Sequence, residues 1–252
     1  MMIKITERCS MGCSHCMNSA KADGMDMPLD IFRDAIQFLK ENSIGQFLVL
    51  TGGEPTEHKQ FWEMMQLLKE MGKGYFLNVT ITTNGENILK EKSRYVEFQK
   101  SCEFPVCFQI SADKRFYPRR INVKDSLFKN LAFVLCDNCV TQIYPQGRAM
   151  ENHLPWIAKA SKCFNVRAVS KQIATDDTLQ KLEGILAAHG KHCTPHIKIN
   201  GDIGLGESDL CPSCSSIYKD GKQIMDDIRT FTCHGCDFIN QQLPAAYRKF
   251  VL

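Results

Sequence analysis

The 252-residue sequence contains no long hydrophobic run and no strong excess of charge. Its longest apolar segments, residues 47–50 and 131–136, are far shorter than the ~20 residues that a membrane-spanning helix requires. Residues 1–9 include charged side chains and lack the apolar centre of a signal peptide. A net charge of +3 is too small to indicate a nucleic-acid-binding surface. We therefore expect a cytoplasmic protein with no membrane partner and no nucleic-acid partner.

Cysteine, in contrast, is abundant. Thirteen of the 252 residues are cysteine, which is a smaller share than the ~8–10% of short disulfide-rich secreted proteins. A chain of this length buries a full hydrophobic core without disulfides. Because no signal peptide is evident, clustered cysteines indicate metal binding or catalysis more often than disulfides.

Strand-like and helix-like segments alternate along most of the chain, which predicts βαβ units and a mostly parallel sheet. The fold class that we expect is α/β, a partial (β/α)6 barrel formed by residues 1–190, followed by a small cysteine-rich extension at residues 191–252. The expected strands are 2–6, 47–51, 76–82, 106–111, 140–144 and 165–169. The expected helices are 28–41, 58–71, 89–99, 124–135, 154–162 and 178–189.

Three cysteines with C-x3-C-x2-C spacing, Cys9, Cys13 and Cys16, follow the first expected strand. Three thiolates on one loop can hold three irons of a 4Fe–4S cluster, which leaves the fourth iron open for a ligand. The spacing alone also suits buried apolar thiols, or three zinc ligands that await a distant fourth.

A second motif, Gly52-Gly53-Glu54, follows the second expected strand. Adjacent glycines allow the backbone to approach a ligand closely, and Glu54 can accept hydrogen bonds from an ammonium group. The same residues also suit an ordinary turn between a strand and a helix.

Together and in this order, the two motifs resemble the radical S-adenosylmethionine (radical SAM) superfamily over roughly residues 2–170. The resemblance implies that the three cysteines bind the cluster, that S-adenosylmethionine chelates the open iron, and that the glycine–glutamate turn supports its methionine amino group. His15, before the third cysteine, would pack near the adenine. Looser matches at the ends of later strands give further cofactor-binding candidates: Thr83, Asn84, Ser111, Asp113 and Arg148. Arg148 suits the methionine carboxylate or a surface salt bridge, and Asn84 also suits a hairpin-like Asn-Gly turn.

A second group of cysteines lies in the last 60 residues. The spacing of Cys211, Cys214, Cys233 and Cys236 is typical of a zinc ribbon, and the same four thiols can hold an iron–sulfur cluster. The segment from Cys193 resembles the opening of the auxiliary-cluster modules called SPASM and twitch. In that interpretation an expected hairpin with its turn at Gly201 precedes Cys211, and Cys214 is spare or an alternative ligand. We predict one auxiliary 4Fe–4S cluster, with zinc as the alternative metal.

The resemblance implies an enzyme that reductively cleaves S-adenosylmethionine to a 5′-deoxyadenosyl radical, which then abstracts hydrogen from a substrate C–H bond. A low-potential donor such as a flavodoxin or ferredoxin would supply the electron. Auxiliary-cluster members often crosslink or oxidise peptides, so a peptide or protein side chain is the expected substrate. The alternatives are a small metabolite, such as a nucleotide-derived heterocycle or an amino acid, and a non-catalytic zinc-ribbon binding protein.

Overall fold

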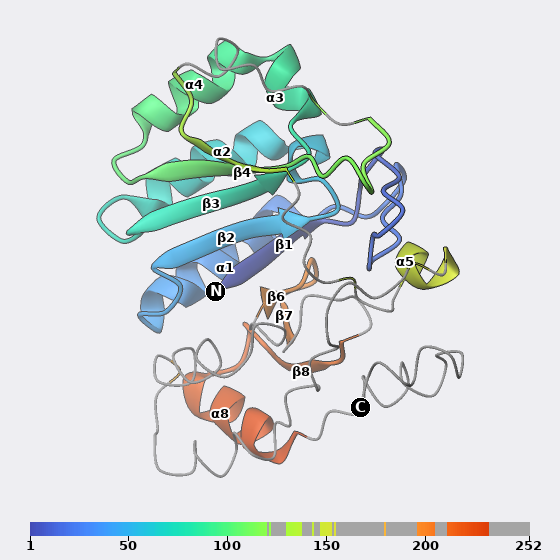
Figure 1. Cartoon of the computed structure of the whole chain (residues 1–252). Coiled ribbons are helices and arrows are strands. Elements are labelled where there is room, and N and C mark those ends of the chain that lie inside the picture. The colour runs from blue at the N-terminus through green and yellow to red at the C-terminus, as the bar shows by residue number, and fades with distance from the viewer. Residues whose placement is uncertain are drawn as a thin grey trace.

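The computed structural model of the chain describes the following residues: 1–119, 121, 130–137, 143, 147–152, 154, 179, 196–204 and 211–231. Within these residues the strands form a single eight-stranded sheet in the order β5-β4-β3-β2-β1-β6-β7-β8 (Figure 1). Neighbouring strands from β5 to β6 are parallel, and β6, β7 and β8 are antiparallel. The strands are β1 (Met2–Thr6), β2 (Phe47–Gly52), β3 (Asn78–Thr83), β4 (Val106–Ser111), β5 (Phe133–Cys136), β6 (His196–Ile197), β7 (Asp202–Gly204) and β8 (Ser213–Ser216).

Helices connect the parallel strands and cover one face of the sheet (Figure 1). They are α1 (Leu29–Glu41), α2 (Phe61–Gly72), α3 (Glu86–Lys90) and α4 (Lys92–Ser101), with α5 (Gly147–Glu151) and α8 (Gly221–Thr230) further along the chain. A short 3-10 helix, η1 (Pro55–Glu57), follows β2. α1 begins directly after Pro28, whose fixed backbone angle suits a helix start, and buries Phe32, Ile36 and Leu39 at helical spacing.

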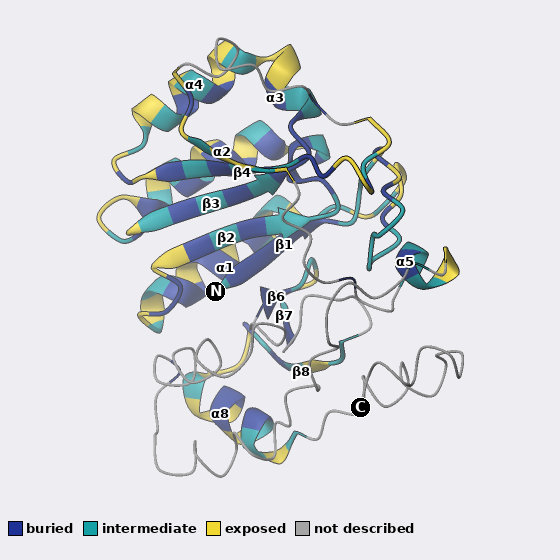
Figure 2. Cartoon of the chain, viewed as in Figure 1, coloured by how far each residue is buried: buried dark blue, intermediate teal, exposed yellow. Residues whose placement is uncertain are grey.

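Side chains alternate between the two faces of the sheet. One set is buried in the hydrophobic core and includes Leu50 of β2, Ile81 of β3 and Phe108 of β4. In Figure 2 buried and partly buried positions follow one another along these strands. Their neighbours in sequence point to the opposite face and are only partly buried. We call this opposite surface the inner face; in β2–β4 it comprises Val49, Thr51, Thr80, Thr82, Cys107 and Gln109.

The α/β class and the partly open parallel sheet are confirmed, and the first four expected strands match β1–β4. The expected helix at 89–99 is divided between α3 and α4. The fifth strand, however, is β5 at Phe133–Cys136, so the expectation of a helix through residue 135 is wrong. The apolar run 131–136 has no periodicity that separates a helix from a strand, and its aromatic and β-branched residues favour the strand. α5 was not expected from the sequence.

The expected hairpin before Cys211 is present as β6 and β7. His196 pairs with Gly204, and Gly201 occupies the turn with φ +84°, a left-handed conformation that favours glycine. β6 also pairs with β1, so the hairpin extends the sheet of the N-terminal strands. The strands expected at 140–144 and 165–169 and the helices at 154–162 and 178–189 lie almost wholly outside the described residues. No helix among the described residues is both long and apolar enough to span a membrane.

Candidate cofactor site

The three N-terminal cysteines lie on a loop that leaves β1 and returns to the start of α1. Two backbone hydrogen bonds hold the arms of this loop together: the Glu7 N–H donates to the Met25 carbonyl at 2.7 Å, and the Cys9 N–H donates to the Lys21 carbonyl at 2.8 Å. The loop therefore has a fixed base, and the cysteines lie between its two arms. We call residues 7–26 the cysteine loop.

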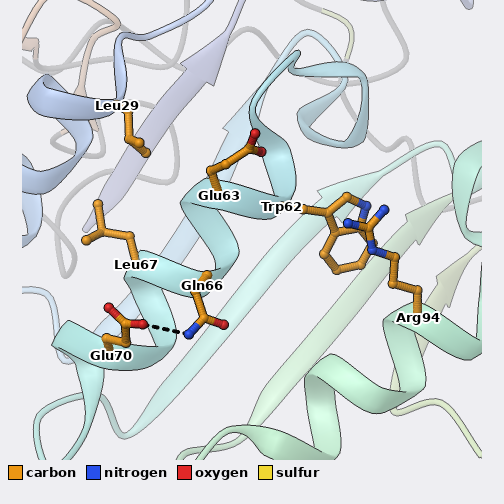
Figure 3. Close-up of a pocket in the computed structure, with 7 residues that line it drawn as sticks. All are labelled: Leu29, Trp62, Glu63, Gln66, Leu67, Glu70 and Arg94. Atoms are coloured by element: carbon orange, nitrogen blue, oxygen red, sulfur yellow. Dashed lines mark hydrogen bonds between the residues drawn. The ribbon is translucent and has the colours of Figure 1, made fainter.

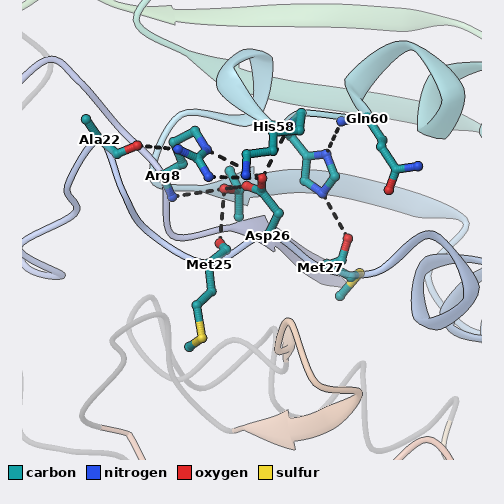
Figure 4. A network of polar contacts seen from close by, with 9 residues as sticks. Arg8, Ala22, Met25, Asp26, Met27, His58 and Gln60 are labelled. Atoms are coloured by element: carbon teal, nitrogen blue, oxygen red, sulfur yellow. Dashed lines mark hydrogen bonds and ion pairs between the residues drawn. The ribbon is translucent and has the colours of Figure 1, made fainter.

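A polar network at the base of the cysteine loop joins its two ends (Figure 4). Asp26 accepts a hydrogen bond from the Thr6 hydroxyl at 2.5 Å and forms an ion pair with Arg8 at 3.3 Å. Arg8 also donates to the Ala22 carbonyl. Burial acts to raise the pKa of Asp26, but the hydrogen bonds from Thr6 and Arg8 hold that pKa below its ordinary value. The carboxylate is thus kept ionised where it fixes the loop.

His58 secures the same region from the segment after β2. Its Nδ1 accepts a hydrogen bond from the Gln60 N–H at 2.9 Å, so its proton lies on Nε2, which faces the Met27 carbonyl at 2.9 Å (Figure 4). The imidazole is buried and links the segment after β2 to Met27, just before Pro28 and the start of α1. Sequence reasoning did not identify Asp26 or His58.

The Gly52-Gly53-Glu54 turn packs directly against the entrance to the cysteine loop. The Gly53 N–H donates to the Thr6 carbonyl at 2.7 Å, and the Glu54 N–H donates to the Arg8 carbonyl at 2.6 Å. A Cβ atom on Gly52 would lie 2.3 Å from the Thr6 oxygen, and one on Gly53 would lie 2.3 Å from the Arg8 oxygen. Only glycine permits this approach, so the two motifs are interlocked through their backbones.

The Glu54 carboxylate joins the turn after β2 to the turn after β3. It accepts hydrogen bonds from the Thr56 hydroxyl at 2.6 Å, the Thr83 hydroxyl at 2.7 Å and the Asn84 N–H at 2.6 Å. Only 2% of Glu54 is exposed, and this burial raises its pKa against the opposing effect of its donors. The structure therefore gives Glu54 a bridging role within the protein. Its contact with an ammonium group stays a prediction.

The Asn84-Gly85 turn leads from β3 into α3, so the hairpin interpretation of this motif is wrong: β3 and β4 are parallel, and a tight two-residue turn joins only antiparallel strands. The Asn84 side chain accepts a hydrogen bond from the Glu86 N–H at 2.9 Å, and Gly85 has φ +81°. Asn84 thereby stabilises the start of α3.

The loop after β4 contacts the cysteine loop from the other side. The Phe116 carbonyl accepts a hydrogen bond from the Ser14 N–H at 3.1 Å, and the ring of His15 lies 4.8 Å from the ring of Phe116. Burial lowers the pKa of His15 to about 4, so the imidazole is neutral at pH 7. Asp113, in the same loop, is buried and holds Arg115 at 2.6 Å. Ser111 ends β4 on the inner face, half-buried.

Arg148 reaches the cysteine loop from α5. Its Nε donates to the Cys13 carbonyl at 3.0 Å and its Nη1 donates to the Ala20 carbonyl at 2.8 Å. Gly147 makes this approach possible, because a Cβ there would lie 2.6 Å from the Met17 oxygen. Two of the guanidinium donors are thus directed to the loop itself. No salt bridge of Arg148 is found among the described residues, and contact with a methionine carboxylate stays a prediction.

The donor chemistry of the cysteine loop fits an iron–sulfur cluster. Burial raises the pKa of Cys9 to about 11 and that of Cys13 to about 12, and the neighbouring thiols raise the pKa of Cys13 further. Such thiols keep their protons until a metal displaces them. Within the described residues no three His, Cys, Asp or Glu side chains gather around one point as a single metal ion requires. A cubane does not require this, because each thiolate binds a different iron. The buried His15 Nδ1, which has no hydrogen-bond partner among the described residues, is an additional polar atom that a ligand can satisfy.

The second cysteine group is only partly described. Cys211 and Cys214 lie at the start of β8, where the Cys211 carbonyl accepts a hydrogen bond from Lys198 at 2.6 Å and the Cys214 thiol donates to the Ile203 carbonyl at 3.2 Å. The other predicted ligands, Cys193, Cys233 and Cys236, lie outside the described residues.

A separate pocket lies on the helical side of the sheet and contains none of the predicted site residues (Figure 3). It lies mainly along α2, and the Arg94 guanidinium stacks over the Trp62 ring at 4.2 Å. The residues that line it are Leu29, Trp62, Glu63, Gln66, Leu67, Glu70 and Arg94.

The arrangement of the motifs around the sheet defines a class of protein. A parallel α/β sheet presents a three-cysteine loop after β1, a glycine–glutamate turn after β2, and polar turns after β3 and β4, all at the carboxyl ends of the strands. Residues 3–125 match the family model described as the Radical SAM superfamily. Residues 3–125 are therefore a radical SAM domain.

Two curated relatives match parts of the chain. Mycofactocin maturase MftC from Mycolicibacterium smegmatis is 28% identical over 107 residues, which cover 40% of this chain and 26% of the relative. The mitochondrial GTP 3′,8-cyclase of Arabidopsis thaliana is 33% identical over 100 residues, which cover 38% of this chain and 25% of the relative. The chain thus matches about a quarter of the length of these relatives.

Solved structures of Streptococcus suis SuiB share the fold. SuiB itself is similar with a TM-score of 0.53 at 16% sequence identity, covering 91% of this chain and 67% of SuiB. SuiB bound to S-adenosylmethionine is similar with a TM-score of 0.52 over the same shares. This similarity supports the α/β fold but assigns no role to any residue of this chain.

Proposed function

We propose that the chain is a radical SAM enzyme that cleaves S-adenosylmethionine reductively and modifies a peptide or protein side chain. The observation that carries the proposal is the interlocked pair of motifs. The cysteine loop and the Gly52-Gly53-Glu54 turn share backbone hydrogen bonds of 2.6–2.7 Å at the carboxyl end of the sheet. Ligands of parallel α/β sheets bind at this end.

In this proposal Cys9, Cys13 and Cys16 hold a 4Fe–4S cluster with one open iron. With S-adenosylmethionine bound, that cluster would supply the radical chemistry needed to remove hydrogen from an unactivated C–H bond. The protein keeps the cysteine loop in place from several sides and presents backbone groups of the glycine–glutamate turn beside it. His15, being neutral, offers an aromatic surface and a hydrogen-bonding nitrogen without adding charge.

The remaining residues of the site are assigned by position. Thr83 and Asn84 donate hydrogen bonds to Glu54, which joins the turn after β3 to the turn after β2. Ser111 faces inward at the end of β4 and is available to a ribose hydroxyl. Asp113 pairs with Arg115, and we propose its contact with the ribose from its place after β4 alone.

A peptide substrate is supported by the similarity to a maturase and by the resemblance of the second cysteine group to auxiliary-cluster modules. We propose that Cys193, Cys211, Cys233 and Cys236, with Cys214 as an alternative, hold one auxiliary 4Fe–4S cluster. A low-potential flavodoxin or ferredoxin would reduce the enzyme. The similarity to a GTP cyclase supports a second candidate, a radical SAM enzyme that acts on a small nucleotide-derived metabolite.

Iron analysis tests the cofactor assignment. Anaerobically reconstituted protein should contain about four irons for one cluster or about eight for two. With dithionite and S-adenosylmethionine it should form 5′-deoxyadenosine. Cys13→Ala should abolish this product. Cys102→Ala removes a cysteine that is partly buried and packs against the hydrophobic core, and should preserve the product. Colourless protein that contains only zinc, or undiminished 5′-deoxyadenosine from Cys13→Ala, would refute the assignment.

A further inference from the structure

Ser10, the residue that follows Cys9 in the cysteine loop, is held by two charged side chains from outside the loop. Glu57 accepts two hydrogen bonds from it: the Ser10 N–H donates to Oε2 at 2.9 Å, and the Ser10 hydroxyl donates to Oε1 at 2.8 Å. Arg119 donates from Nη2 to the Ser10 carbonyl at 2.9 Å. Every polar group of Ser10 is therefore engaged, although the residue itself is exposed.

The side chains that hold Ser10 come from three different segments of the chain. Glu57 is the last residue of η1, and Arg119 lies in the loop after β4, 109 residues beyond Ser10. Glu86, the first residue of α3, fixes the guanidinium in turn, because its Oε1 accepts a hydrogen bond from the Arg119 Nε at 3.0 Å. We call these four residues the serine clamp. One member follows each of the strands β1, β2, β3 and β4.

The charges of the serine clamp lie next to a proposed cluster ligand. Ser10 is bonded directly to Cys9, so the carboxylate and the guanidinium that grip Ser10 are both one residue away from that thiol. The hydrogen bond to Glu86 and the charge of Glu86 are the main causes that raise the pKa of Arg119, and the thiolate form of Cys9 raises it further. The positive charge of Arg119 is thus near enough to act on a negative charge at Cys9.

Such charges matter more for a redox centre than for folding. The Arg119 side chain is 53% exposed, and exposed ion pairs add little stability. The reduction potential of an iron–sulfur cluster, in contrast, depends on the charge and the hydrogen bonds around it. Because reduction adds a negative charge, a fixed cation nearby favours the reduced form, and a fixed carboxylate favours the oxidised form. The hydrogen bonds of the serine clamp hold both kinds of charge at one place.

We propose that Arg119 is a positioning residue that fixes Ser10 beside Cys9 and whose charge raises the reduction potential of the cluster, while Glu86 lowers that potential by offsetting the charge. This inference rests on the proposed function for the presence of the cluster, and it assigns residues outside the two motifs to the control of its reduction. In that step the flavodoxin or ferredoxin is oxidised by one electron and the cluster is reduced by one electron. No bond forms or breaks, and no proton moves.

The test measures a potential and does not depend on turnover. Anaerobically reconstituted protein, without S-adenosylmethionine, is poised at fixed potentials with dithionite and redox mediators, and the reduced cluster is quantified by electron paramagnetic resonance. Arg119→Gln should lower the midpoint potential, so that the ratio of reduced to oxidised cluster at a fixed poise falls at least ~2-fold, as a unit charge near the cluster implies. Glu86→Gln should raise the same ratio. Arg119→Lys, which keeps the charge, should change it less than Arg119→Gln.

The opposite signs separate a charge effect from a loss of structure. Arg119→Gln and Glu86→Gln weaken the same hydrogen-bonded pair, so mere loosening of the serine clamp would move the potential in the same direction in both variants. Concentrated salt should reduce both shifts, because it screens exposed charges. Arg94→Gln is the matched control: it removes an exposed arginine that pairs with Glu91, as Arg119 pairs with Glu86, but lies on α4. It should leave the ratio unchanged.

Circular dichroism and iron content check that each variant folds and is loaded. If Arg119→Gln does not retain iron, Glu86→Gln should still raise the midpoint potential and Arg119→Lys should still leave it close to that of the unaltered protein. Unchanged potentials, shifts of the same sign in Arg119→Gln and Glu86→Gln, or an equal shift in Arg94→Gln would overturn the proposal. Protein that holds no cluster would refute the proposed function and this inference together. Loaded protein that forms 5′-deoxyadenosine with unchanged potentials would refute this inference alone.

Discussion

Replacing Arg148 by methionine is the sharpest test of how the cysteine loop is held. The substitution keeps an unbranched apolar side chain but removes two hydrogen bonds from a charged donor, one to the Cys13 carbonyl and one to the Ala20 carbonyl. Hydrogen bonds that involve a charged group contribute ~1.5–3 kcal/mol each. Because the guanidinium is only partly buried, we use the lower value, which gives about 3 kcal/mol for the pair.

Since ~1.4 kcal/mol corresponds to a factor of ten, Arg148→Met should make local opening of the cysteine loop ~100-fold more frequent. Amide hydrogen exchange reports this directly, because the Cys9 N–H is protected by its bond to the Lys21 carbonyl. We expect exchange in a peptide covering residues 9–21 to accelerate ~100-fold in the absence of any nucleotide. Iron retention after reconstitution should fall in parallel.

Arg94→Met is the matched control, because Arg94 stacks on Trp62 within the separate pocket on the helical side of the sheet. Exchange in the cysteine loop should not change in this variant. The omission of nucleotide is essential. If Arg148 acted only by binding the carboxylate of S-adenosylmethionine, Arg148→Met would exchange like the unaltered protein under these conditions, and that result would refute the loop-holding role.

Three further perturbations follow from the same geometry. Gly53→Ala places a Cβ 2.3 Å from the Arg8 carbonyl oxygen and should lower the unfolding free energy by ~1–3 kcal/mol in denaturant titrations; Gly221→Ala, whose Cβ would come no closer than 3.3 Å to the Asn42 side-chain oxygen, should cost less, and equal losses would contradict the interlock. The pKa of Asp26 is lowered in the folded protein, so its ionised form contributes stability above its unfolded pKa and loses that contribution as pH falls through its folded pKa. The difference in denaturation midpoint between the unaltered protein and Asp26→Asn should therefore shrink as the pH falls below ~4, and a difference independent of pH would refute this assignment. Finally, burial raises the pKa of Cys13 to about 12. In iron-free folded protein at pH 8 this thiol should therefore react slowly with iodoacetamide, and in guanidinium it should react fast. Rapid alkylation of the folded protein would contradict the burial of Cys13.

The sequence predicts those parts of the site whose residues follow directly after a strand. Cys9, Cys13 and Cys16 follow one strand directly, and Gly52-Gly53-Glu54 follows another. Parallel neighbouring strands bring their carboxyl ends to the same edge of the sheet, so contact between these motifs follows from the strand prediction alone. The structure confirms that contact as a pair of backbone hydrogen bonds.

Contacts that depend on the path of a loop could not be predicted. Arg8 and Asp26 are 18 residues apart in sequence and meet only because the cysteine loop turns back on itself. Arg148 lies 135 residues after Cys13, beyond a region where an apolar run obscured the position of β5. No periodicity in the sequence encodes either contact. Gly147 precedes Arg148 and has the left-handed φ of +52°. The sequence shows the glycine, but the part of the cysteine loop that its backbone approaches becomes visible only in the fold.

The distribution of these contacts explains how a loop rich in thiols keeps a fixed shape before any metal binds. Arg8 and Asp26 fix its base, the glycine–glutamate turn fixes its entrance, Phe116 holds its middle, and Arg148 holds its far arm. Apart from the Asp26 carboxylate at the base, the loop groups that accept these contacts are backbone carbonyls, and at Ser14 the loop donates a backbone N–H. Because backbone atoms make these contacts, the fold restricts the positions of the thiols without using their sulfur atoms. A loop ordered in this way has less conformational entropy to lose when a cluster binds, which favours cluster retention.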